Sequence, residues 1–422
     1  MTLRVLHLAG SAVSDFLGDL SRLYAADCLE HTADPTRYEF HVAYVAPDRR
    51  WRFPDGLSRE ALAAAEPVPL AGAMQQLADL DADVALPQMF CLPGMTSYRA
   101  LLDVAGIPYV GSPPGVMALA ADKANAKAVV AAAGVRVPAG EVLRPGDQPC
   151  LDPPVVVKPV DGDNSLGTTL VRDRSGYPAA LDAAFAHSGA ALVESYVELG
   201  REVRCGIVVR DGELACLPLE EYNVDPDTKP IRGYADKIGR NEGGELSLVA
   251  KDASRAWIVD PADPLTRRVW AAARRCHRAL GCRHYSLFDF RVDPAGQPWF
   301  LEAGLYCSFA EKSVIATMAR AAGITLPSLF RIAIEQAVTG LGNHARRSRR
   351  GPSHTDYWAM GLSQRLHGLE LLLQRRVSGS QRLVSPTVEQ PGGPGMRIPR
   401  FLYRSASYYN ALHESSAERS PE

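Results

Sequence analysis

Two acidic residues stand in apolar, strand-like sequence toward the end of the chain. Residues 285–309, YSLFDFRVDPAGQPWFLEAGLYCSF, read as two short strands joined by the turn DPAGQP. Asp289 lies between two phenylalanines in the first strand, and Glu302 follows Trp-Phe-Leu in the second. A buried carboxylate is costly unless it is paired, hydrogen-bonded or bound to a metal. Two such acids on neighbouring strands are therefore expected to bind a cation or a hydrogen-bond donor.

A lysine followed by a glycine-containing loop suggests a second chemical site. In VVVKPVDGDNSLGTTLV, residues 155–171, an apolar strand delivers Lys158, and a loop of small residues leads back to another strand. Free backbone N–H groups beside a lysine make a good cradle for phosphate. The loop matches neither the GxxxxGK[ST] nor the GxGxxG pattern. Taken alone, a surface lysine followed by a β-hairpin explains it equally well.

Three further charged residues indicate a functional site only when their order along the chain is considered. Lys123 opens a helical stretch in AADKANAK, and Glu194 and Glu202 occur in LVESYVELGREVRCG. Acids at a strand end beside a bend can accept hydrogen bonds from an adenine amino group or from ribose hydroxyls. Each alone has a simple alternative, a solvated lysine or solvated loop acids.

Composition restricts the class of protein. The chain has 422 residues, of which 46% are hydrophobic and 22% charged, with net charge −2. This is typical of a globular protein with two to four domains, and gives no field that favours nucleic acid or an anionic membrane. The eight cysteines are scattered without CxxC spacing, which argues against a disulfide framework or a zinc site. No apolar run approaches membrane-spanning length, so we expect a cytoplasmic protein.

The elements that must position these residues alternate between strand and helix. Strand-like LRVLHLAG, YEFHVAYV and ADVALP are separated by helical sequence, which predicts a doubly wound parallel sheet over residues 1–115. The Ala-rich residues 115–138 read as one long helix, and Asp211-Gly212 reads as a hairpin turn. The segment after residue 340 is basic and rich in Gly and Pro, which predicts a linker followed by a tail.

As an ordered series, the two lysines, the glycine loop and the four acids resemble the ATP-grasp fold, in particular the D-alanine–D-alanine ligase branch. The resemblance covers about residues 1–338. It implies an α/β (α+β) protein of three domains: an N-terminal substrate domain (1–115), a central ATP-grasp subdomain (116–205) and a metal-binding subdomain (206–340). Residues 341–422 would be a basic linker and a partly helical or disordered tail.

The resemblance also implies a site, with ATP and Mg²⁺ (or Mn²⁺) as cofactors. Asp289 and Glu302 would bind the metal, and Lys237, Lys158 and Ser165 would act on the transferred phosphate. The carboxylate of an incoming amino acid would meet Ser313 and Lys312, with Tyr306 and Phe309 lining a ring pocket. The residues implied for ATP are Lys123, Lys158, Asn164, Ser165, Gly167, Glu194, Ser195, Tyr196, Val197 and Glu202.

Two positions depart from the family pattern of Arg-x-Asp and Leu-Glu-x-Asn, because Leu287 stands at the Arg and Gly304 at the Asn. Four segments also look like the mycosporine-glycine amino-acid ligases: HLAGSAVSDFLGDLSRLYAADCLE, LPQMFCLPGMTSYRAL, LPLEEYNVDPDTKPIRGYADK and RHYSLFDFRVDPAGQPWFLEAGLYCSFAEKSVI. That resemblance implies that a serine- or threonine-like amino acid is joined to mycosporine-glycine, giving an imino-mycosporine such as shinorine or porphyra-334. Nucleic acid and membrane partners are not expected. A homodimer is expected.

Two alternatives stay open at this point. One is a D-alanine–D-alanine-type ligase, which joins a carboxylate to an amine through an acyl phosphate. The other is a protein that binds ATP without catalysis, since the Arg and the Asn of the family pattern are missing. The retained lysines and acids argue against the second alternative.

Overall fold

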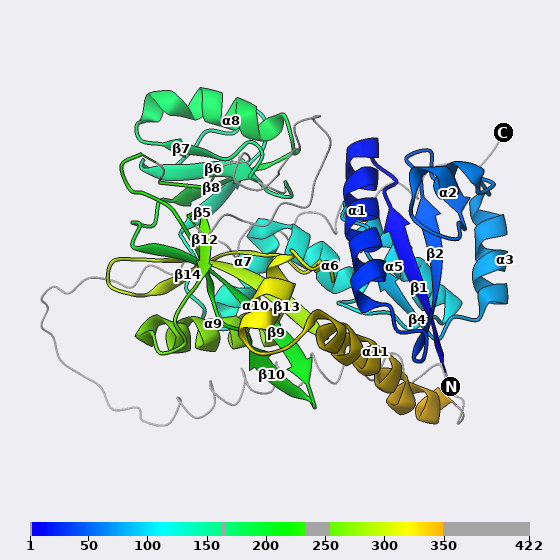
Figure 1. The fold of residues 1–422 in the computed structure, drawn as a ribbon. Coiled ribbons are helices and arrows are strands. Elements are labelled where there is room, and N and C mark those ends of the chain that lie inside the picture. The colour runs from blue at the N-terminus through cyan, green and yellow to red at the C-terminus, as the bar shows by residue number, and fades with distance from the viewer. Residues whose placement is uncertain (1, 163–164, 229, 233–253, 349–422) are drawn as a thin grey trace, which may run out of the picture. The chain divides into compact units, whose positions relative to one another are not determined.

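The computed structural model describes residues 2–162, 165–228, 230–232 and 254–348, and the chain divides into the units Met1–Thr339 and Gly340–Glu422. All that follows concerns the first unit (Figure 1). It contains three sheets with the strand orders β3-β2-β1-β4, β5-β8-β6-β7 and β12-β11-β9-β13-β14. No helix among the described residues has both the length and the apolar character needed to cross a membrane.

The first sheet has the predicted parallel core. Strands β1 (Leu3–Gly10), β2 (Tyr38–Val45) and β4 (Val84–Pro87) are parallel, and the short β3 (Trp51–Arg52) joins the edge in antiparallel sense. The central strands β1 and β4 are almost wholly buried, as is usual for parallel strands covered on both faces, whereas β2 is buried at only four of its eight positions. The helices of this region are α1 (Asp15–Thr32), α2 (Arg59–Ala64), α3 (Leu70–Leu80), α4 (Leu92–Met95) and α5 (Ser97–Ala105).

The second sheet is antiparallel and carries the glycine loop. Its strands are β5 (Gly140–Leu143), β6 (Val155–Pro159), β7 (Thr169–Val171) and β8 (Ala191–Ser195). After the 3₁₀ turn η1 (Arg174–Gly176), helix α8 (Tyr177–Phe185) packs its buried alanines against this sheet. Figure 1 shows α8 lying along it.

The single helix predicted over residues 115–138 is in fact two helices, α6 (Pro114–Ala121) and α7 (Lys123–Ala132). The break is at Asp122, whose extended backbone ends the first helix while its carboxylate accepts a hydrogen bond from the Asn125 N–H at 2.9 Å. An aspartate in this position is a strong N-cap, so it starts a new helix in place of continuing the old one. Alanine content alone did not reveal the break.

The third sheet contains β9 (Arg201–Arg210), β10 (Glu213–Cys216), β11 (Glu220–Tyr222), β12 (Ala256–Ile258), β13 (Tyr285–Val292) and β14 (Pro298–Ala303). β9 and β10 form the predicted hairpin, with positive φ at Asp211 and Gly212. The domain boundary predicted at 205/206 falls inside β9, which belongs entirely to this sheet. We therefore place that boundary between β8 and β9.

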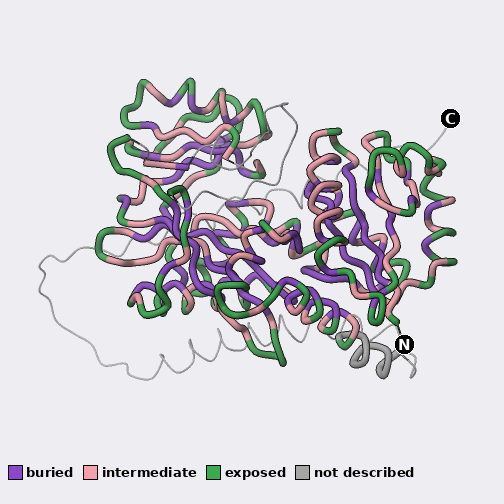
Figure 2. Tube along the Cα trace, in the orientation of Figure 1, coloured by how far each residue is buried: buried purple, intermediate pink, exposed green. Residues whose placement is uncertain are grey.

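The two faces of the third sheet differ in character. Val203, Cys205 and Ile207 of β9 pack with Phe288 and Phe290 of β13 in a core that α7 and α9 (Pro264–Leu280) complete. The alternate residues of both strands therefore point to the opposite face. β13 is buried along its whole length, and buried segments are purple in Figure 2. Helices α10 (Val314–Ala321) and α11 (Leu326–Ser348) complete the fold.

Candidate active site

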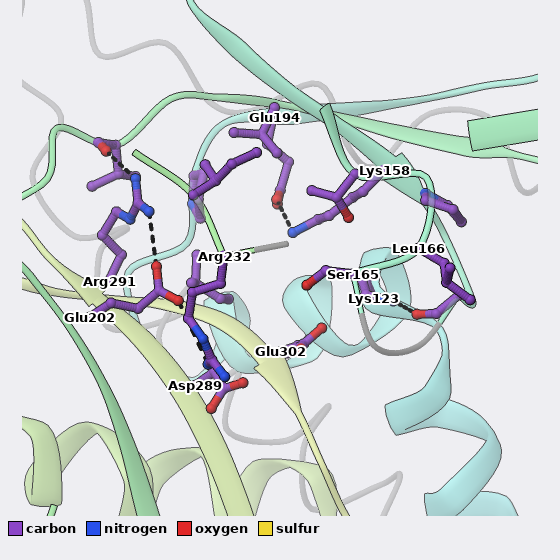
Figure 3. A pocket seen from close by; sticks show the side chains of 18 of the residues that line it. Lys123, Lys158, Ser165, Leu166, Glu194, Glu202, Arg232, Asp289, Arg291 and Glu302 are labelled. Atoms are coloured by element: carbon purple, nitrogen blue, oxygen red, sulfur yellow. Dashed lines mark hydrogen bonds and ion pairs between the residues drawn. The ribbon is translucent and has the colours of Figure 1, made fainter. Parts of the chain in front are cut away.

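One cavity brings together most of the residues singled out from the sequence. Nine of them line it: Lys123, Lys158, Ser165, Glu194, Ser195, Val197, Glu202, Asp289 and Glu302. They come from the second sheet, the third sheet and the start of α7. In Figure 3 the side chains of Asp289, Glu302, Lys158 and Ser165 point toward the same space. Residues almost 180 positions apart in the sequence therefore form one charged site.

Lys123 is held at the mouth of the glycine loop. Its ammonium group donates to the Gly162 carbonyl, and its backbone N–H donates to the Val160 carbonyl at 3.0 Å. As the first residue of α7, it also lies where the helix dipole favours anions. Lys123 and Lys158 are both buried, with 8% of each residue exposed. Two buried cations that line one cavity, one of them at a helix start, suit a polyphosphate group.

The loop itself is bent by two left-handed residues, Ser165 with φ of 58° and Gly167 with φ of 66°. At Gly167 a Cβ would lie 2.6 Å from the Ala183 carbonyl oxygen of α8, so only glycine fits. Gly167 does not line the cavity. Packing against α8 already explains this glycine, and its predicted contact with ATP stays a prediction. Asn164, also predicted for ATP, lies outside the described residues.

Glu194 lies between two lysines. Its carboxylate oxygens are 2.9 Å from Lys127 Nζ and 2.6 Å from Lys158 Nζ, and all three side chains are buried. Burial acts to raise the pKa of Glu194, but the two ammonium groups outweigh it and hold the pKa below its usual value. Glu194 was predicted to face adenine; in this structure both of its oxygens are held by lysines, and that role stays a prediction.

Lys127 was missed in the sequence, although it lies one helical turn after Lys123 on the same face of α7. It also donates to the Phe300 carbonyl of β14 at 2.9 Å, so it links the second and third sheets. Burial lowers its pKa to about 8 from the usual 10.5. Between these two values the unfolded chain binds a proton that the folded chain has lost. The contribution of Lys127 to stability therefore rises with pH across this window.

We expect the free energy of unfolding of the wild type to rise, relative to that of Lys127→Met, by about 1 to 2 kcal/mol between pH 7.5 and pH 9.5. The reason is that the wild type no longer keeps a charged ammonium group in a buried place. Urea unfolding at both pH values, followed by circular dichroism, measures the difference. If the gap between the two proteins stays constant, Lys127 titrates equally in the folded and unfolded states.

Asp289 and Glu302, the two acids in apolar strands, are direct neighbours. Asp289 of β13 is paired with Glu302 of β14 in the ladder, so their side chains share a face. Asp289 is 6% exposed, and Arg204 of β9, its neighbour on the other side, binds both of its oxygens, with Nη2 at 2.6 Å from Oδ2. Arg204 was not singled out from the sequence.

The acid pair fits Mg²⁺ when phosphate is present. Two carboxylates supply hard oxygen ligands, and Mg²⁺ usually takes one or two of these and completes its shell with water and substrate phosphates. Within the described ranges, no group of three or more His, Cys, Asp or Glu side chains is placed to hold a metal. The nearby lysines provide the place for the phosphates. The donor set therefore suits a cation that arrives with a nucleotide.

Glu202 forms the second acid–arginine pair across β9 and β13. Arg291 donates to Glu202 Oε2 at 2.9 Å and also to the Val197 carbonyl at 3.2 Å. Its guanidinium lies 5.2 Å from the centre of the Tyr196 ring, which itself does not line the cavity. Arg291, also missed, fixes the segment after β8 against the third sheet. The sequence signal was its position two residues after Asp289, on the same face of the strand.

The residues predicted for the amino-acid substrate lie elsewhere. Ser313 is buried as the N-cap of α10, Lys312 is exposed, and the Tyr306 ring lies 5.6 Å from that of Phe90. None of them lines the cavity. Phe309 is fully buried among Tyr285 and Phe330 of the core, so its predicted place in a ring pocket is wrong. Lys237 lies outside the described residues.

The sequence is similar to those of known proteins. The family model described as D-ala D-ala ligase C-terminus matches residues 148–335. The D-alanine–D-alanine ligase of Citrifermentans bemidjiense is 34% identical over 55% of this chain and 71% of the relative. D-alanine–D-alanine ligase A of Mesorhizobium japonicum is 30% identical over 76% of this chain and 93% of the relative.

The chain belongs to the D-alanine–D-alanine ligase family. It is accordingly an ATP-grasp enzyme that forms carbon–nitrogen bonds, with ATP and Mg²⁺ as cofactors. Solved ligases confirm the fold: that of Coxiella burnetii superposes with TM-score 0.63 at 19% identity, covering 82% of this chain and 97% of the other. The VanG D-Ala:D-Ser ligase of Enterococcus faecalis gives 0.63 at 20% identity, covering 81% and 99%.

Two positions separate this chain from the ligase family's usual pattern. Leu287, where the pattern has Arg, is 6% exposed and lies in a hydrophobic core. Gly304, where the pattern has Asn, has room for a side chain, because a Cβ there would meet only the Leu287 Cβ at 3.9 Å. Space does not explain the missing Asn.

Proposed function

We propose that this ligase joins a serine- or threonine-like amino acid to mycosporine-glycine, giving an imino-mycosporine such as shinorine or porphyra-334. The observation that carries the proposal is Leu287, a buried apolar side chain where the family pattern has an arginine. That arginine stabilises the oxyanion formed when an amine attacks an acyl phosphate. Its replacement suits an electrophile that forms no such oxyanion, and the four sequence segments quoted above support the same acceptor.

The chemistry follows from the acceptor's ring. Mycosporine-glycine carries a conjugated ring ketone, a vinylogous amide. ATP would transfer its γ-phosphoryl group to the ring carbonyl oxygen with release of ADP. The amino group would then add to that carbon, and the C–O bond would break as phosphate leaves, which gives the imine after loss of a proton. Charge is spread over the N–C=C–C unit throughout, so the loss of one fixed donor, worth about 3 kcal/mol in acyl transfer, is tolerable.

The residues of the cavity have corresponding roles in this proposal. Lys123 and Lys158 would hold the phosphates, and Asp289 and Glu302 would hold Mg²⁺, which when bound neutralises charge on the transferred phosphoryl group. Glu202 and the backbone beside Val197 would contact the ribose and the adenine. Ser313 with Lys312 would receive the amino acid's carboxylate, and Tyr306 would border the ring; a homodimer is expected.

The second candidate is a D-alanine–D-alanine-type or other carboxylate–amine ligase, which makes an acyl phosphate. The names of the relatives favour it, because both relatives identified above are D-alanine–D-alanine ligases. This second candidate requires another group to stabilise the oxyanion, because residue 287 is a leucine. The two candidates share the nucleotide site and differ only in the oxygen that receives the phosphoryl group.

A single assay separates the candidates. We expect the purified chain with ATP, Mg²⁺, mycosporine-glycine and serine or threonine to release ADP and to form a product that absorbs at longer wavelength, with its mass checked by mass spectrometry. ADP release with D-alanine alone would instead establish the second candidate. ATP turnover with neither acceptor, in the presence of a broad amino-acid mixture, would point away from both.

A further inference from the structure

Four charged residues form one row across the third sheet. The ladder pairs Glu220 of β11 with Arg204 of β9, Arg204 with Asp289 of β13, and Asp289 with Glu302 of β14. Directly paired residues share a face, so all four side chains lie on the cavity side of the sheet. Three carboxylates and one guanidinium leave the row with a formal charge of two negative units.

Arg204 is bound firmly within this row. It engages both oxygens of Asp289, and its guanidinium lies 5.7 Å from the centre of the Tyr222 ring. The side chains of Arg204 and Asp289 are 18% and 8% exposed. A two-point arginine–carboxylate contact with little solvent is among the stronger pairings in proteins. Burial alone would lower the pKa of Arg204, and the Asp289 carboxylate reverses this and raises the pKa well above its usual value.

The neighbouring row on the same face contains no charge. It consists of Gly206, Leu287 and Gly304, where Gly206 pairs with Leu287 and the Gly304 N–H donates to the Leu287 carbonyl at 2.9 Å. The family pattern has both an arginine and a metal-binding asparagine here. This chain has lost both groups together and has a guanidinium one step away, on β9.

We infer that Arg204 takes the place of a second divalent cation, so that this active site binds one Mg²⁺ with each ATP. Each oxygen of Asp289 accepts one guanidinium N–H, which leaves one lone pair on each oxygen for a metal. The guanidinium also fixes the orientation of Asp289, which makes Arg204 a positioning residue. Without a side-chain oxygen at residue 304, a second cation has fewer ligands and meets the charge of Arg204.

The inference rests on one part of the proposed function, the binding of ATP. Its test uses neither the acceptor nor the amino acid. The probe is Mn²⁺ together with AMP-PNP, an ATP analogue that is not hydrolysed. The complex is separated from free nucleotide, and Mn²⁺ is counted against bound nucleotide by electron paramagnetic resonance. We expect one Mn²⁺ per nucleotide for the wild type. Two would overturn the inference, whichever acceptor the enzyme uses.

Variants then test the role of Arg204 itself. The double variant Arg204→Gln/Gly304→Asn removes the guanidinium and supplies an amide oxygen, so we expect it to bind two Mn²⁺ per nucleotide. Gly304→Asn alone and Arg204→Lys keep the positive charge and should still bind one. A second Mn²⁺ in either single variant, or only one in a correctly folded double variant, would refute the assignment. Circular dichroism verifies folding, and the wild-type count stands by itself if the double variant fails to fold.

Discussion

Replacing Glu302 by glutamine is expected to lower ATP turnover about 100- to 1000-fold without changing the fold. Glutamine has nearly the same shape, and Glu302 is only partly buried, so its place on β14 is kept. The change removes one of the two carboxylates available for Mg²⁺ beneath the phosphates. Release of ADP, measured with the acceptor and amine that the wild type uses, gives the rate. Nucleotide binding without a metal should change little.

The matched control is Glu213→Gln. Glu213 is an exposed acid on β10 of the same sheet, outside the cavity. It undergoes the same chemical change and should turn over ATP at the wild-type rate. If Glu302→Gln keeps a tenth or more of the activity, Glu302 is not a metal ligand and the acid pair has another purpose.

The sequence predicted those features that depend on local pattern. The β13–β14 hairpin was visible because apolar runs flank a Pro- and Gly-containing turn, and this alone placed Asp289 near Glu302. Asp211 and Gly212 revealed the β9–β10 hairpin in the same way, since both adopt the positive φ that this turn requires.

Two further cations of the site, Arg204 and Lys127, could not be predicted from local pattern. Arg204 and Asp289 are separated by 85 positions, and only the register of β9 against β13 makes them partners. Lys127 needs both Glu194 of β8 and the Phe300 carbonyl of β14 before its burial makes sense. An arginine or lysine in a sequence is usually a solvated residue, and nothing beside it reveals a distant carboxylate.

Two glycines also show what cannot be predicted from the sequence alone. Gly167 belongs to a small-residue loop that suggests phosphate binding, yet the carbonyl of Ala183 in α8 already excludes any side chain there. At Gly304 the opposite holds, because a side chain would fit and none is present. Whether a glycine is required by packing or is a lost functional group can be decided only from the atoms around it. This is why the departure at residue 304 carries functional information and the glycine at 167 carries little.

Glu194→Gln is expected to lower the free energy of unfolding by about 3 kcal/mol, because it removes one partner of a buried ion-pair group. Lys127 and Lys158 would then lie close together in a buried place without a balancing charge. Urea unfolding at pH 7 measures the loss. If Glu194 also contacts adenine, the variant should bind ATP more weakly even under conditions where it is fully folded.

Two comparisons isolate the cause of this loss. Asp152→Asn makes the same chemical change in an exposed pair with Arg174, near the same sheet, and should cost no more than about 1 kcal/mol. Adding Lys127→Met to Glu194→Gln removes one of the two unbalanced charges, so the double variant should be more stable than Glu194→Gln alone. If Glu194→Gln costs no more than the exposed control, the lysines do not depend on Glu194, and its carboxylate is kept for the nucleotide instead.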